Sequence, residues 1–160
     1  MSQSTAGVLT QPSITFSKSK AFTVTAHIAR AILGLIFLVF GLNGFLHFIP
    51  MPPPTGAAAD FSTGLFKGQY FFPLMAFTQV VSGILLLSGT LVSLALLMLF
   101  PIALNIFFFH LVLAPSGLGM AIFIMAAITL LAVYYWPVYR PIFKTGNAWT
   151  NKRSRIEFIN

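Results

Sequence analysis

Residues 91–113 read LVSLALLMLFPIALNIFFFHLVL, an apolar run that contains no acidic residue, lysine or arginine. A helix needs about 20 predominantly apolar residues to cross a bilayer, and this run is long enough. The run also carries Pro101, Asn105 and His110. Because lipid offers no hydrogen-bond partner to a polar side chain, Asn105 and His110 must meet protein, water or a ligand. The run therefore predicts a membrane helix that belongs to a bundle.

The composition of the whole chain agrees with this interpretation. Hydrophobic residues make up 58% of the 160 residues and charged residues only 7%, and the mean hydropathy is +0.91. A soluble domain of this size could not bury so much apolar surface, so the lipid bilayer is the first predicted partner. The net charge is +7, but the basic residues stand beside the apolar runs and suit anionic lipid headgroups, which argues against a nucleic-acid partner. The absence of cysteine excludes thiolate chemistry, and no metal site is predicted.

Four apolar runs predict an all-α integral membrane protein built as a four-transmembrane-helix bundle. The expected spans cover residues 24–49, 71–88, 91–113 and 118–136. We expect a disordered cytoplasmic leader over residues 1–22, a membrane domain over 23–140 and a basic cytoplasmic tail over 141–160. Turns of three and four residues separate the last three spans, which makes these neighbours antiparallel. In the proline-rich loop between the first two spans, residues 57–66 predict a short interfacial helix.

Basic residues at the two ends of the chain predict its orientation. Those beside the first and fourth spans are Lys18, Lys20, Arg30, Arg140 and Lys144, against Lys67 alone in the loop. The positive-inside rule then places both termini in the cytoplasm, and an even number of spans agrees. We interpret Arg30, Arg140 and Lys144 as membrane-surface anchors. A charge held inside the bundle is the alternative for Arg30.

With this orientation, polar side chains from three spans gather in the outer half of the membrane. They are Asn43, His47, Gln79, Asn105 and His110. At 1.5 Å per residue, His47 and His110 lie about 3 to 5 Å below the outer ends of their helices. Asn43 and His47 stand one helical turn apart, and Pro101 can bend the third span beside Asn105. We interpret these five residues as a candidate ligand-binding site. The alternative is that each satisfies a neighbouring carbonyl or water.

Small residues form stripes on the first two spans. Gly34, Gly41 and Gly44 share one face of the first span, and Ser82 and Gly83 lie near Gln79 on the second. Small side chains let helix backbones approach closely in a membrane. These residues are therefore predicted to pack helices, either within the bundle or in a homodimer.

Three stretches of the chain resemble the DoxX family of small bacterial inner-membrane proteins. They are ARAILGLIFLVFGLNGFLHFIPMPPP, GQYFFPLMAFTQVVSGILLLSG and LALLMLFPIALNIFFFHLVLAP, and the resemblance covers about Ala29 to Arg140. It implies a four-helix bundle in the bacterial cytoplasmic membrane, an association with quinone-linked or oxidative-stress redox chemistry, and a redox partner subunit. Arg30, Asn43, His47, Asn105 and His110 match the family, whereas Gln79 replaces its common glutamate.

The sequence leaves three functions open and does not decide whether the protein is an enzyme. The first is a redox-associated subunit that binds a quinone, with His47 or His110 hydrogen-bonded to a quinone carbonyl. The second is a non-catalytic scaffold or small-solute carrier without a cofactor. The third and least favoured is a haem protein with His47 and His110 as axial ligands.

Overall fold

The computed structural model describes residues 19–143, and every regular element in this range is a helix. In chain order these are α1 (Lys20–Leu46), α2 (Ala57–Lys67), α3 (Phe71–Ser88), α4 (Val92–Val112), the 3₁₀ helix η1 (Pro115–Gly117), α5 (Leu118–Tyr134) and α6 (Trp136–Phe143). Four helical segments are long and apolar enough to cross a membrane, namely α1, α3, α4 and η1 with α5. The prediction of an all-helical chain with four candidate spans, as in a multi-pass membrane protein, is thus confirmed.

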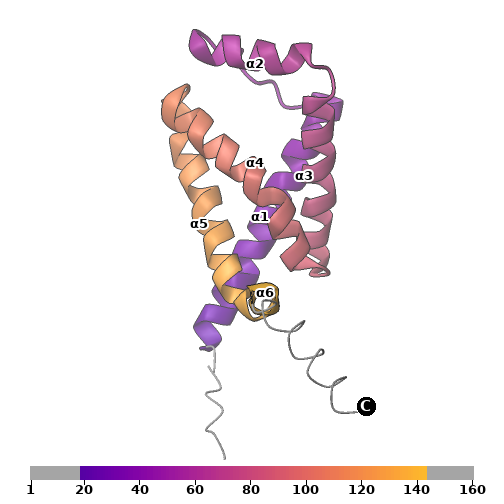
Figure 1. Ribbon diagram of the computed structural model, residues 1–160, viewed down its shortest axis with the longest axis vertical. Helices are drawn as coiled ribbons and strands as arrows, with labels where there is room; N and C mark the ends of the chain where they lie inside the picture. Colours follow the sequence, from indigo (N-terminus) through magenta and orange to yellow (C-terminus); the bar gives the residue numbers. More distant parts are fainter. Residues whose placement is uncertain (1–18, 144–160) are drawn as a thin grey trace, which may run out of the picture.

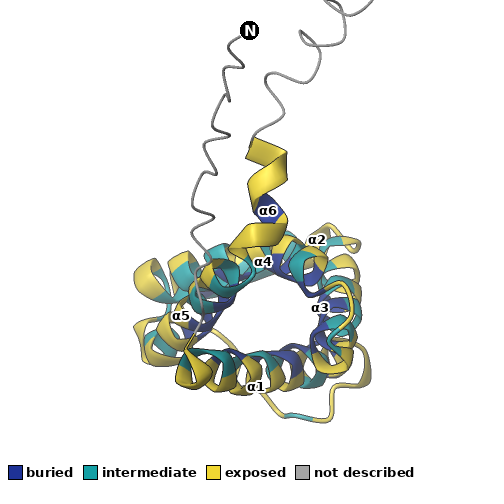
Figure 2. Cartoon of the chain, turned by 90° about the horizontal axis from the view of Figure 1, so that it is seen from below, coloured by how far each residue is buried: buried dark blue, intermediate teal, exposed yellow. Residues whose placement is uncertain are grey.

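The four long helices run side by side, and the two short helices mark opposite ends of the bundle. Helix α2 lies across one end, and α6 lies at the other (Figure 1). We call these the α2 end and the α6 end. Viewed along the bundle, α1, α3, α4 and α5 follow one another around a ring (Figure 2), and each contacts the next. Large apolar side chains such as Leu35, Phe77 and Phe123 are exposed on the outside, which suits lipid as the surrounding solvent.

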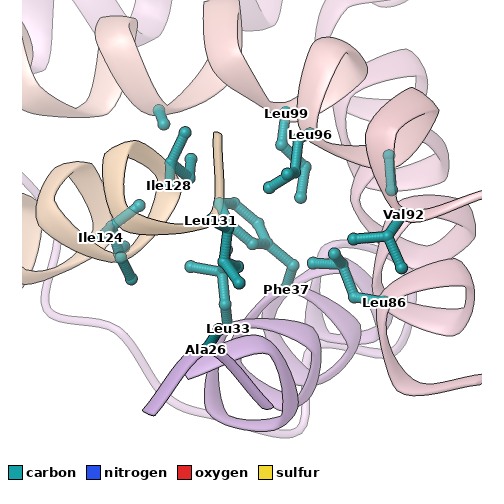
Figure 3. Close-up of a cluster of buried hydrophobic side chains, with 13 residues drawn as sticks. Ala26, Leu33, Phe37, Leu86, Val92, Leu96, Leu99, Ile124, Ile128 and Leu131 are labelled. Carbon is teal, nitrogen blue, oxygen red and sulfur yellow. The ribbon is translucent and has the colours of Figure 1, made fainter. Parts of the chain in front are cut away.

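The hydrophobic core fills the part of the ring toward the α6 end. Leu33, Leu86, Leu99 and Leu131, one from each long helix, have no exposed surface. Figure 3 shows how these side chains meet around Phe37. Because all four long helices contribute to one cluster, the α6 end of the bundle is held together by close packing.

Helices α1 and α3 pack through their small residues. A Cβ atom added to Gly83 would lie 2.7 Å from the backbone nitrogen of Leu38, and one added to Gly41 would lie 2.8 Å from that of Val80. A Cβ on Gly44 would come within 2.7 Å of the Ala76 side chain. Side chains at these glycines would therefore separate the helices. Two further small residues, Gly34 and Ser82, are buried, and the glycine stripe of α1 faces α3 rather than the outside.

The ends of α1 differ from the prediction. The helix begins at Lys20, because the Ser19 hydroxyl accepts a hydrogen bond from the amide of Phe22 at 3.2 Å and caps the first turn. Residues 20–22 therefore belong to α1 and not to the predicted leader. The helix ends at Leu46, because His47 has a left-handed backbone with φ 51°. Residues 1–18 and 144–160, with Lys144 and nearly all of the predicted leader and tail, lie outside the described residues.

Helix α6 was not predicted from the sequence. The Tyr139 side chain is buried, and its hydroxyl donates a hydrogen bond to the carbonyl of Ser93 at 2.8 Å. This bond fastens α6 to the first turn of α4. Arg140 is exposed on α6, and Arg30 reaches the same end, where a side chain at Gly89 would collide with its guanidinium.

Candidate functional site

A cavity of about 1000 Å³ opens among the long helices at the α2 end. All four long helices line it, together with the loop before α2 and the residues around the α2–α3 turn. Most of the wall is apolar, with Ile36, Phe40 and Met75 as examples. Phe37 and Ile124 line the cavity and also belong to the core cluster. The packed core therefore closes the cavity toward the α6 end.

The Gln79 amide lies in the wall of the cavity and has no hydrogen-bond partner among the described residues. It lies near the middle of α3, and only 6% of its surface is exposed. Met75 and Ala76, which precede it by four and three residues, line the same cavity. The Gln79 amide makes no hydrogen bond within residues 19–143. The enclosed side-chain atoms without a partner among the described residues are Arg30 Nε and Ser82 Oγ, so the Gln79 amide is open to the cavity, where a water molecule or a ligand can satisfy it.

His110 is held in one tautomer by the chain that follows it. Its Nδ1 lies 2.9 Å from the carbonyl oxygen of Ala114. A carbonyl can only accept, so Nδ1 carries the proton, and Nε2 of the neutral ring is left as an acceptor. The ring also lies against Gly117, where any side chain would collide with it. A ligand that meets Nε2 must therefore donate the hydrogen bond.

Asn43 and His47 both line the cavity, but they do not form the predicted pair on one helical face. His47 is the C-cap of α1, and its amide donates to the carbonyl of Asn43 at 2.9 Å. The Asn43 side chain is occupied by Ile49: its Oδ1 accepts from the Ile49 amide at 2.6 Å, and its Nδ2 donates to the Ile49 carbonyl at 3.4 Å. Asn43 therefore fixes the chain after α1, whereas the exposed His47 imidazole remains available.

Asn105 does not belong to the cavity, and this part of the predicted site is corrected. Its side chain is exposed on the outer face of α4, while its neighbour Ile106 lines the cavity. The prediction failed because α4 is apolar on all sides, so its sequence does not indicate which face turns inward. The structure thus brings together Asn43, His47, Gln79 and His110, and it separates Asn105 from them.

The residues that cover the cavity were not predicted from the sequence. Phe66 and Gln69, at the end of α2 and just after it, belong to the lining. Ring contacts attach α2 to the bundle, between Phe61 and Phe109 at 5.8 Å and between Phe66 and Phe72 at 6.1 Å. The only signal for this cover in the sequence was the predicted interfacial helix over residues 57–66. The proline-rich loop before that helix leaves the position of the helix on the bundle open.

The lining of the cavity includes no Asp, Glu or Cys side chain. Within residues 19–143 there is no group of three or more His, Cys, Asp or Glu side chains that could hold a metal ion. No protein-family model, curated protein or solved structure matches this chain, so membership of the DoxX family stays a prediction.

Proposed function

We propose that the protein binds an amphipathic ring compound that carries hydroxyl groups, with a quinol as the leading candidate, in the cavity at the α2 end. The observation that carries this proposal is the buried Gln79 amide, which has no partner in the described chain and lines a largely apolar cavity. An apolar cavity with a few polar groups is the usual form of a small-molecule site. A ring would contact the apolar wall, and its oxygen atoms would satisfy Gln79.

His110 supports the reduced rather than the oxidised form of such a ligand. The sequence analysis expected a histidine to donate to a quinone carbonyl. Because the Nδ1 proton of His110 is used by Ala114, Nε2 can accept from a quinol hydroxyl but cannot donate to a carbonyl while the ring is neutral. The contact with His110 therefore favours a hydroxyl donor such as a quinol.

A redox-associated role follows only with a partner subunit. The two acidic residues of the chain, Asp60 and Glu157, stand outside the four apolar runs, and Gln79 is not ionisable. These residues offer no acid in the cavity that could relay a proton. Together with the resemblance to the DoxX family, this supports a subunit that holds the quinol while a partner protein accepts its two electrons and water at the open end of the cavity takes up its two hydroxyl protons.

We also propose that the protein lies in a bacterial cytoplasmic membrane, with both of its termini in the cytoplasm. The charge asymmetry of the sequence supports this orientation, and it places the α2 end and the cavity at the outer surface. A scaffold or solute carrier is the alternative. The packed floor formed by Phe37 and Ile124 favours a closed binding site over a passage.

Titration of the purified protein with a short-chain quinol and the matching quinone tests the proposal. We expect the quinol to bind more tightly than the quinone. Replacing Gln79 by Leu should weaken quinol binding by about tenfold, because a hydrogen bond in an apolar site is lost. His110→Phe should remove the preference for the quinol.

Thr129→Val is the matched control, because this hydroxyl lies on the exposed side of α5 and donates to the carbonyl of Met125 on its own helix. The Thr129→Val variant should bind the quinol with the affinity of the wild type. Failure of both ligands to bind, or equal affinities for all variants, would contradict the proposal. A haem absorption band in the purified protein would favour a haem protein over a quinol-binding protein.

A further inference from the structure

One face of α4 remains exposed from one end of the helix to the other. Its exposed residues follow one another at intervals of three and four positions: Leu94, Leu97, Pro101, Asn105, Phe108 and Val112. Residues with this spacing form a single narrow stripe along a helix. We call this stripe the α4 face. It points away from the cavity, which is lined by Ile106 and His110 of the same helix.

Asn105 places an unsatisfied amide in the middle of the α4 face. It lies about 20 Å along the helix from Val92 and about 10 Å from Val112, well inside the candidate span. Its side chain makes no hydrogen bond to any part of the chain that the structure describes. The exposed threonines on two other spans behave differently. The hydroxyls of Thr78 and Thr129 each donate at 2.8 Å to a carbonyl one turn earlier on their own helix.

Pro101 adds a second polar group to the same face. Proline has no amide hydrogen, so the carbonyl of Leu97 loses the donor that it would have in a regular α-helix. Both Leu97 and Pro101 belong to the exposed stripe. Within a membrane, carbonyls freed by proline are satisfied by neighbouring helices, by side chains or by water. The α4 face thus carries two groups that lipid cannot satisfy.

We propose that the α4 face pairs with the α4 face of a second copy of this chain. Two copies inserted in the same direction are related by a two-fold axis along the membrane normal, so each residue on the face meets its own counterpart. Asn105 then faces Asn105. An amide is both donor and acceptor, so it satisfies its own copy across the axis. The leucine and phenylalanine side chains above and below it form the rest of the contact.

The glycine stripes do not compete for this role. Gly41 of α1 already packs against Val80 of α3, and Gly83 of α3 already packs against Leu38 of α1 inside one bundle. Pairing through α4 also leaves the cavity unobstructed, because its lining residues lie on the opposite side of the helix. The dimer and the ligand site are therefore independent inferences.

Disulfide crosslinking in lipid vesicles tests the pairing directly, because the natural chain has no cysteine. Single variants Leu97→Cys and Phe108→Cys place a thiol on the α4 face. Phe77→Cys on α3 and Ile122→Cys on α5 place one on other exposed faces. Only residues whose Cα atoms approach within about 7 Å can form a disulfide. We expect covalent dimers from the first pair upon mild oxidation and monomers from the second pair.

Asn105→Leu in the Leu97→Cys background measures the contribution of the amide. The dimer should dissociate roughly 3- to 20-fold more readily, the range covered by hydrogen bonds between membrane helices. Asn105→Gln should retain most of the crosslinking, and Thr129→Val should have no effect. Thermal unfolding of each variant in detergent verifies that the bundle is intact. Equal crosslinking on all faces, monomers throughout, or a folded Asn105→Leu variant that dimerises fully would overturn the proposal, as would a crosslink to a different protein in native membranes.

Discussion

Individual side chains determine what each end of the bundle can do. At the α2 end, the Ala114 carbonyl selects the tautomer of His110, and the Asn43 side chain fixes the turn after α1 through two bonds to Ile49. At the α6 end, Tyr139 joins α6 to α4. In the first two cases a polar side chain satisfies backbone groups at or just after the end of a helix, whereas the Ser93 carbonyl lies in the first turn of α4 and accepts the Tyr139 hydroxyl as an additional donor.

The contact between Tyr139 and Ser93 predicts that α6 detaches at high pH. Burial raises the pKa of the Tyr139 phenol above its usual value near 10. The folded protein then keeps the proton at a pH where the unfolded chain has lost it. The stabilisation is therefore complete below the unfolded pKa and is lost as the pH rises through the folded pKa. Melting temperatures in detergent should fall more steeply above about pH 10 for the wild type than for Tyr139→Phe.

The same substitution should lower the free energy of unfolding at neutral pH by about 0.5 to 1.5 kcal/mol, the usual contribution of one hydrogen bond. Tyr70→Phe is the control, because the Tyr70 side chain is exposed. A Tyr139→Phe variant with wild-type stability and an unchanged pH profile would show that α6 is held by other contacts.

For the helices, the sequence predicts which segments are helical better than it predicts which face of each helix turns into the bundle. The four spans were predictable from their length and apolar composition, and α2 from the pattern of residues 57–66. Helix α6 was missed because Pro137 and Pro141 resemble helix breakers. Pro137, however, is the second residue of this helix, where no amide donor is required.

For the candidate site too, the sequence predicts the position of a residue along its helix but not the direction in which its side chain points. Four of its five residues could be assigned to the cavity from their depth, because depth follows from the helical rise alone. Rotation about the helix axis does not, and for the uniformly apolar α4 it depends on packing with α3 and α5. Asn105 was therefore grouped with the other four residues, although its side chain lies on the outer face of α4. Gln69 was missed because the turn after α2 carries no periodic signal, and Phe66 was missed because the proline-rich loop before α2 leaves the position of that helix open.

Gly83, which lies at the contact between α1 and α3, and Gly64, which lies in α2, should respond differently to substitution by alanine. Gly83→Ala places a methyl group 2.7 Å from the backbone nitrogen of Leu38, and backbone atoms cannot move aside cheaply. We expect a loss of about 1 to 3 kcal/mol in the free energy of unfolding, as for other overpacked sites. Gly64→Ala in α2 meets no atom within 4 Å and should be neutral or slightly stabilising, because alanine favours a helix.

Denaturation of both variants in the same detergent provides the comparison. If Gly83→Ala is as stable as the wild type while Gly64→Ala is also neutral, the two helices are less tightly packed than the structure indicates.

For the molecule as a whole, the packed α6 end and the hollow α2 end give the bundle a direction. We expect this direction to match the membrane, with the cavity outside and both termini inside. Reporter fusions after Thr55 and Ser116 should indicate an external location, and fusions after Gly89 and Asn147 a cytoplasmic one. An external signal from the Gly89 and Asn147 fusions would reverse the orientation and place the cavity at the cytoplasmic surface.

We propose that a hydroxyl-bearing ring compound satisfies the Gln79 amide in the cavity. The most direct test is a crystal structure of the protein purified from its native membrane in a mild detergent. We predict a planar group in the cavity, with one oxygen atom at about 3 Å from the Gln79 amide and another at a similar distance from His110 Nε2. An acyl chain that passes Gln79 while water alone satisfies the amide would contradict this claim.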